Sequence, residues 1–173
     1  PHLTTRQLLD FFANNFNFDA RDTTAIMGAH ALGRTYPVNS GINGGDGWTR
    51  NPNAFNNKFY TRLLGSNGLV DNDFVHEQQD GSGHFIWRER FDNEFMLDAD
   101  MALAVDLEGF MTDPTVGSVS CSLSGNNPCP ESPLLGIANE YANDNNAWMI
   151  DFYIAFIRMT NMGCDGVATC TAV

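Results

Sequence analysis

The chain has 173 residues, 43% of them hydrophobic, which is enough for one domain with a buried core. Its formal net charge of −12 argues against nucleic-acid binding, because such binding depends on lysine and arginine to neutralise phosphates. No apolar stretch approaches the length of a membrane span. The sequence begins with proline and shows no signal-peptide pattern, so we expect a mature or processed product.

The first thirty residues predict two helices. Residues 4–16 carry apolar side chains at helical spacing, with Thr4 or Thr5 as the N-cap. Asp19 is the expected N-cap of a second helix, which continues to His30. The apolar positions of the first segment predict that this pair of helices packs on a common core.

The middle of the chain predicts a loop, a longer helix and a hairpin. Residues 37–47 are rich in glycine, asparagine and serine and are expected to form a loop. An Asn-Pro pair favours the start of a helix over 51–64, because proline is preferred at the first helical position. Residues 85–96 place Phe, Ile and Trp around an Asp-Asn pair, which is typical of a small hairpin. A short helix is expected to begin at Asp98 or Asp100.

The last third combines an irregular segment with a final helix. Residues 107–134 are rich in glycine, proline, serine and asparagine, and we assign them no catalytic role. The final helix is expected to begin at Asn145 or Asn146. The face that we expect in the core carries Phe152, Phe156 and Met159.

Four cysteines occur late in the chain. Cys121 and Cys129 lie in the irregular segment, and Cys164 and Cys170 lie in the C-terminal tail. None has the paired spacing of a zinc site. An even number in loop-like surroundings predicts disulfides, and hence an extracellular or lumenal compartment. Four cysteines allow three connectivities. We favour the one that contains the two local pairs, Cys121–Cys129 and Cys164–Cys170, because both close short loops.

The most informative stretch is residues 26–35, with the sequence IMGAHALGRT. Its single histidine, His30, follows an apolar helical run and is surrounded by glycine and alanine. A slim backbone of this kind lets a flat macrocycle lie beside an imidazole that reaches its iron. The alternative is a histidine buried in the core. His76 and His84, in contrast, are expected in polar loops.

Residues 26–35 resemble the proximal-histidine motif of the haem peroxidase superfamily, in the branch of cytochrome c peroxidase and ascorbate peroxidase. Three further blocks follow in the family's order, over 47–52, 96–103 and 140–156. The resemblance implies a mainly α fold, the proximal helical half of a haem peroxidase with a small β-hairpin. Residues 1–163 would form this domain, with a cysteine-containing loop insertion at about 107–134, and residues 164–173 its tail.

The resemblance also implies a haem b cofactor with His30 as the axial ligand of its iron. Asp100 would be the buried acceptor for the other ring nitrogen, giving the ligand imidazolate character and lowering the reduction potential of the iron. Trp48 would stack beside the pair, where some family members hold a radical. The alternatives are a helix N-cap for Asp100, an aromatic core residue for Trp48 and a solvated side chain for Arg34. The residues expected to line the haem or contact its propionates are Ile26, Met27, Ala29, Gly33, Arg34, Tyr36, Asn39, Phe59, Phe95, Leu97 and Phe156.

Two departures from the family pattern argue against ascorbate as the donor and against a bound cation. Asn39 stands where relatives that use ascorbate carry an arginine, which argues against ascorbate at that edge. At the position of a cation site found in some relatives, Thr49 and Asn51 match, but Ala31 and Asn56 replace a hydroxyl and a carboxylate. Loss of these oxygen ligands argues against a tight cation site.

The implied function is oxidation of an unknown donor by hydrogen peroxide. The family's distal Arg-x-x-aromatic-His pattern is absent from the sequence, so we expect a distal half to come from another chain or segment. No nucleic acid or membrane span is expected. One alternative is a peroxidase-like structural or assembly subunit without catalytic activity. Another is a secreted binding module stabilised by cystines, which leaves the four blocks unexplained.

Overall fold

The computed structural model describes residues 2–42, 47–65, 73–79, 83–91, 94–123 and 126–162. The helices are α1 (Thr5–Phe16), α2 (Ala20–Met27), the 3₁₀ helix η1 (Gly28–Ala31), α3 (Pro37–Ser40), α4 (Lys58–Leu64), α5 (Asp98–Met101), α6 (Leu135–Asn143) and α7 (Asn145–Asn161). The strands are β1 (Phe74–Gln78), β2 (Phe85–Glu89), β3 (Phe95–Met96), β4 (Met111–Asp113) and β5 (Ser118–Val119). The fold is therefore mainly α, as expected.

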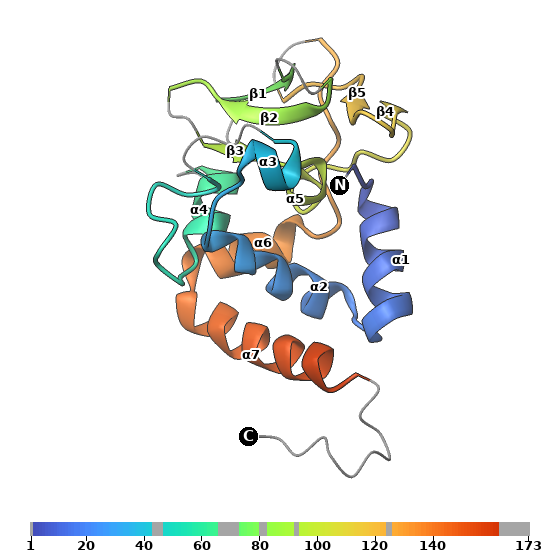
Figure 1. Ribbon diagram of the computed structural model, residues 1–173. Coiled ribbons are helices and arrows are strands. Elements are labelled where there is room, and N and C mark those ends of the chain that lie inside the picture. The colour runs from blue at the N-terminus through green and yellow to red at the C-terminus, as the bar shows by residue number, and fades with distance from the viewer. Residues whose placement is uncertain are drawn as a thin grey trace.

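The helices and the larger sheet form two layers (Figure 1). Helix α2 packs on α6 and α7, and α4 packs on α6 and η1. Strands β1, β2 and β3 form an antiparallel sheet in that order, and α5 contacts β2 and β3. Figure 1 shows α5 between this sheet and the helical layer, which places the start of α5 near the centre of the molecule.

Capping residues fix the starts of the first two helices. The Thr4 hydroxyl accepts from the Gln7 amide at 3.3 Å, and the Gln7 side chain accepts from the Thr4 amide at 3.1 Å. Asp19 and Asp22 form the same reciprocal pair at the start of α2. Capping boxes of this kind satisfy amides that have no partner within the helix. The predicted caps Thr4 and Asp19 are both confirmed.

The second helix changes character before it reaches His30. It is α-helical to Met27 and continues as the tighter 3₁₀ helix η1. Gly28 lies under two buried side chains, since a Cβ there would be 2.7 Å from the Tyr60 hydroxyl and 2.7 Å from Cε2 of Trp148. The glycine therefore allows α4 and α7 to close over the end of α2.

The structure corrects two predictions in the middle of the chain. The helix expected over 51–64 begins only at Lys58, because the Pro52 carbonyl accepts from the Gly33 amide at 2.8 Å and holds residues 51–54 in a turn. Residues 37–47 were expected to be loop throughout, but α3 forms one turn with proline at its first position.

The sheet contains more than the predicted hairpin. Strands β2 and β3 confirm the hairpin, with Trp87 opposite Met96. Strand β1, which was not predicted, pairs with the other edge of β2 and places His76 opposite Trp87. The His76 side chain is only 9% exposed, so its assignment to a polar loop was wrong. His84 does lie outside the strands.

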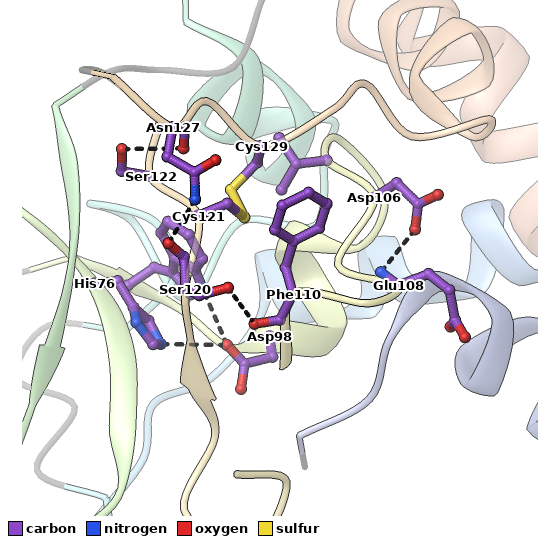
Figure 2. The surroundings of a disulfide bond; sticks show 12 residues. His76, Asp98, Asp106, Glu108, Phe110, Ser120, Cys121, Ser122, Asn127 and Cys129 are labelled. Carbon is purple, nitrogen blue, oxygen red and sulfur yellow. Dashed lines mark hydrogen bonds and ion pairs between the residues drawn. A yellow bond between two sulfur atoms is a disulfide. The ribbon is translucent and has the colours of Figure 1, made fainter. Parts of the chain in front are cut away.

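The segment over 107–134 is more ordered than an unstructured insertion. Strands β4 and β5 pair within it, and the predicted disulfide joins Cys121 to Cys129 (Figure 2). Cys121 is buried in the main core together with Leu107 and Leu134. The predicted pairing of Cys164 with Cys170 lies outside the described residues. The domain boundaries and the tail remain predictions.

The final helix confirms the predicted core face in part, because Phe152 and Met159 pack against the core but Phe156 does not. Its buried residues are Trp148 and Ala155, seven residues apart, and the Trp148 indole donates to the Ala25 carbonyl at 3.0 Å. Phe152 and Met159 continue this stripe and are half-buried. Phe156 follows Ala155 by one residue, which rotates it about 100° around the helix, and it is 48% exposed.

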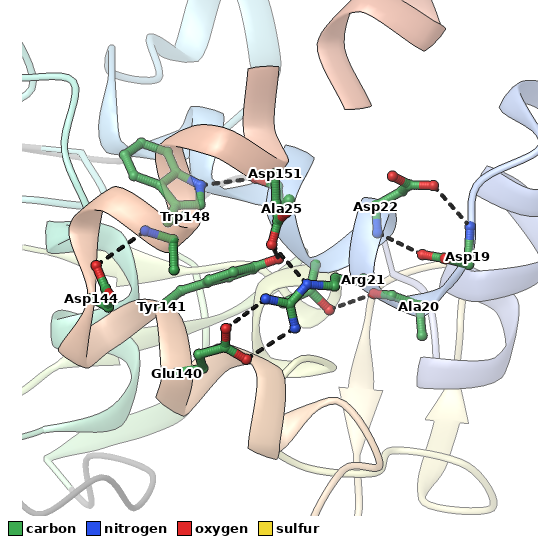
Figure 3. Close-up of polar contacts among 12 residues, drawn as sticks. Asp19, Ala20, Arg21, Asp22, Ala25, Glu140, Tyr141, Asp144, Trp148 and Asp151 are labelled. Atoms are coloured by element: carbon green, nitrogen blue, oxygen red, sulfur yellow. Dashed lines mark hydrogen bonds and ion pairs between the residues drawn. The ribbon is translucent and has the colours of Figure 1, made fainter. Parts of the chain in front are cut away.

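One arginine joins α2, α6 and α7 (Figure 3). The Arg21 guanidinium donates to both oxygens of Glu140 and, at 2.7 Å, to Asp151. The Tyr141 hydroxyl donates to the same Asp151 oxygen at 2.8 Å. The hydrogen bond from Arg21 lowers the pKa of Glu140 below its usual value. Among the described residues, no helix is long and apolar enough to cross a membrane.

Candidate functional site

His30 and Asp100, separated by 70 positions in the sequence, form a hydrogen bond at the centre of the fold. His30 Nδ1 lies 2.7 Å from Asp100 Oδ1, and the Asp100 side chain is fully buried. An ionised carboxylate only accepts hydrogen bonds, so Nδ1 carries the proton in this arrangement. The lone pair of the neutral imidazole is therefore on Nε2, the nitrogen that would bind a metal.

Asp100 accepts two further hydrogen bonds through its other oxygen. The Trp48 indole donates to Oδ2 at 2.7 Å, and the Leu97 backbone amide donates to it at 2.8 Å. The bond from Leu97 lies within the first turn of α5, where Leu97 is the N-cap and Asp100 the third helical residue, so the alternative of Asp100 as the N-cap was wrong. Three donors on one buried carboxylate fix its orientation.

Aromatic rings hold the imidazole in place. The His30 ring stacks on Trp48, with centroids 4.2 Å apart and planes 17° apart, and Phe59 contacts it edge-on at 6.0 Å. Phe95 packs against Trp48 at 4.8 Å. The His30 side chain remains 32% exposed, although Nδ1 is occupied and one face is covered. The ring can therefore be approached from its Nε2 side.

The segment that carries Trp48 is fixed by backbone contacts on both sides. The Gly47 carbonyl accepts from the Phe95 amide at 3.3 Å, and the Thr49 hydroxyl donates to the Ala31 carbonyl at 3.3 Å. Gly47 has φ +103°, and a Cβ there would lie 2.7 Å from the Gly33 carbonyl oxygen. This close approach requires glycine next to the tryptophan.

The remaining predicted site residues fall into three groups. Met27, Phe59, Phe95 and Leu97 are buried in the same core cluster as Trp48. Ala29, Gly33, Arg34, Tyr36 and Asn39 are exposed around the histidine and in the segment that follows it. Ile26 belongs instead to a second cluster with Phe18 and Ala155, and Phe156 stacks on Phe152 along α7. The cofactor roles of all these residues remain predictions.

A second buried carboxylate, Asp98, was not anticipated from the sequence. It accepts from the Trp87 indole at 2.8 Å and lies 2.7 Å from His2 Nδ1, while His76 Nε2 lies 3.6 Å away (Figure 2). The described residues contain no group of three His, Cys, Asp or Glu side chains arranged to hold a metal ion. This cluster thus ties the N-terminal segment and the sheet to α5. The sequence Asp98-Ala99-Asp100 does not indicate which histidine and which tryptophan each carboxylate contacts.

The residues around His30 fit a haem group. The imidazole offers Nε2 on its accessible side, and its other nitrogen is held by a carboxylate, as in metal-bound histidines generally. Large apolar side chains are exposed in the segment after it, with Leu32 at 42%, Tyr36 at 58% and Val38 at 89%. A hydrophobic macrocycle would cover surface of this kind.

Comparison with known proteins agrees with this geometry. The peroxidase family matches residues 1–118. The chain belongs to the haem peroxidase superfamily, in its cytochrome c peroxidase branch. It is 31% identical over 152 residues to the mitochondrial cytochrome c peroxidase of Yarrowia lipolytica, covering 88% of this chain and 35% of that protein. It is 32% identical over 155 residues to the Candida albicans protein of the same name, covering 89% and 32%.

Two consequences follow from these relatives. The chain spans about a third of the length of the curated relatives it matches. The prediction of an extracellular or lumenal protein was wrong, because these cytochrome c peroxidases are mitochondrial. The inference from cysteine number to compartment failed, although the Cys121–Cys129 disulfide itself is present.

Proposed function

We propose that this chain forms the proximal side of a haem peroxidase, with His30 as the axial ligand of haem b. The observation that carries the proposal is the hydrogen-bonded set of His30, Asp100 and Trp48, in which the carboxylate receives three donors. A carboxylate on one ring nitrogen and a stacked indole together orient an imidazole whose other nitrogen is left for a metal. When bound, the haem would supply the redox chemistry by which hydrogen peroxide oxidises a donor.

The protein residues have separate tasks in this proposal. Asp100 keeps the His30 proton on Nδ1 and increases the electron density of the ring, which favours the oxidised state of a bound iron. Trp48 and Phe59 restrict rotation of the imidazole. Met27 and Leu97, both buried, would limit access of water to the proximal side. Arg34 is chemically suited to a propionate carboxylate.

We further propose that the groups that move the peroxide proton come from outside these 173 residues, as a further segment or a partner chain. A peroxidase without a distal proton donor would lose about 10²–10⁴-fold in rate. Adding the distal half should therefore accelerate peroxide consumption by at least this order.

The test compares His30→Ala with His84→Ala in a haem titration followed by absorbance, with circular dichroism to check helicity. We expect His30→Ala to lose the spectrum of histidine-ligated haem while keeping its helices. The control His84→Ala should bind haem as the wild type does. Unchanged haem binding by His30→Ala would refute the ligand assignment. Absence of haem binding by the wild type, even with a distal half added, would favour a structural subunit.

A further inference from the structure

A pocket with three cationic side chains in its wall lies next to the segment that follows Trp48. Its volume is about 470 Å³, and Arg50, Lys58 and Arg62 line it together with one carboxylate, Glu94. The chain has only nine lysines and arginines against 21 acidic residues. A third of all its cationic side chains therefore meet in one pocket of a strongly acidic protein.

Among the described residues that line the pocket, the one carboxylate, Glu94, is already paired with an arginine. Arg62 forms ion pairs with Glu94 and, at 3.3 Å, with Glu89, and the side chains of both glutamates are 2% exposed. Arg62, Glu89 and Glu94 together carry a formal charge of −1. Arg50 and Lys58 bring the formal charge of the whole group to +1, and among the described residues the Lys58 ammonium forms no ion pair, whereas both arginines already have partners.

The remaining lining groups are suited to an anion and poorly suited to a cation. The Asn51 and Asn56 side-chain oxygens accept from backbone amides, which leaves their NH2 groups as donors for an anion. The Thr49 and Thr61 hydroxyls already donate to backbone carbonyls. A hard cation needs several oxygen ligands, usually with a carboxylate among them, and here the carboxylate is paired with arginine. Arginine and lysine are the usual partners of phosphate oxygens, and amide N–H groups can donate to the same oxygens.

We propose that this pocket binds a small phosphate-bearing anion. Its volume exceeds that of a single ion and lies within the range of small-molecule sites. His30 does not line this pocket, but the lining residue Thr49 links the pocket to the segment that carries His30. Thr49 follows Trp48 directly and donates to the Ala31 carbonyl, next to the histidine. Binding can therefore be measured without haem and does not depend on the proposed function.

The single lysine gives a direct test, because Lys58 is the only lysine in the sequence. The probe is inorganic pyrophosphate, added to the purified protein during acetylation of amines, with modification of Lys58 read by mass spectrometry. We expect pyrophosphate to slow acetylation of Lys58 several-fold at saturation. Unchanged acetylation, or protection by potassium or calcium ions in place of pyrophosphate, would overturn the proposal.

Variants separate a built site from general charge attraction. By calorimetry, Lys58→Gln and Arg50→Gln should each bind pyrophosphate about tenfold more weakly, the size expected for loss of one charge-assisted contact. Arg6→Gln is the matched control, since it removes the same charge from a side chain that is 77% exposed on α1. Equal weakening by Arg6→Gln, or wild-type affinity in Lys58→Gln, would show that no specific site exists.

Discussion

Replacing Asp100 with asparagine tests the central hydrogen-bonded set, because the amide has only one acceptor oxygen. The wild-type carboxylate uses Oδ1 for His30 and Oδ2 for both Trp48 and Leu97. If the amide nitrogen replaced Oδ2, it would oppose two buried N–H donors, at a cost of about 2–6 kcal/mol. If it replaced Oδ1, it would oppose only His30, whose ring can change tautomer.

The second arrangement should therefore dominate. His30 Nδ1 would then accept from the amide, and its proton would move to Nε2. Three charge-assisted hydrogen bonds would become neutral ones, each weaker by roughly 1 kcal/mol, so we expect a loss of about 2–3 kcal/mol in the free energy of unfolding. The same change would block metal ligation at Nε2.

Three measurements follow these changes. Urea denaturation gives the stability, nitrogen-15 NMR of the imidazole identifies the protonated nitrogen, and a haem titration gives the affinity. Asp10→Asn is the control, since its side chain is 66% exposed on α1. The reasoning is refuted if Asp100→Asn is as stable as this control, or if its His30 keeps the proton on Nδ1.

Three further predictions concern packing and pH. Gly28→Ala should lower the urea stability by about 1–3 kcal/mol, because the added Cβ would be 2.7 Å from the Tyr60 hydroxyl; wild-type stability would contradict the packing. Burial raises the pKa of Tyr60 above its usual value of 10.0, so stability should fall as the pH rises above about 10, where the unfolded chain releases the proton first. Tyr60→Phe should flatten that alkaline decline in urea midpoints, and an unchanged slope would assign it to other groups. Arg21 lowers the pKa of Glu140 below 4.5, so their contribution is present above that pH and is lost in acid; Glu140→Gln should weaken the acid dependence of the melting temperature, and an unaltered profile would mean that the pair adds no stability.

The sequence predicted the site better than it predicted the elements around it. His30, Trp48 and Asp100 were recognised because the segments that carry them resemble motifs of the haem peroxidase family, and the structure brings the three together. The helix expected from residue 51 failed because a proline rule describes local preference only. The Pro52 carbonyl is held by Gly33, a contact that no local pattern can reveal.

Faces and partners were harder to predict than positions. Phe156 was placed in the core because of its helical spacing from Phe152. In the structure, Asp144 caps α7 and Trp148 packs over Gly28, and in this orientation of the helix Ala155 is buried instead of Phe156. Strand β1 was missed because its only strong apolar residues, Phe74 and Val75, precede the polar His-Glu-Gln sequence. The backbone pairing of β1 with β2 stabilises this strand, although its own composition does not favour one.

The short helix α5 explains why the site needs both layers of the fold. Asp98 and Asp100 stand two residues apart at its start, and each accepts from a different tryptophan and lies beside a different histidine. The Asp98 contacts reach β2 and the N-terminal segment, and the Asp100 contacts reach η1 and the Trp48 segment. Buried carboxylates accept only where donors are aligned, so each set restricts the other's freedom to shift. The contacts of Asp98, which were not predicted, therefore help to fix the position of the predicted Asp100 carboxylate.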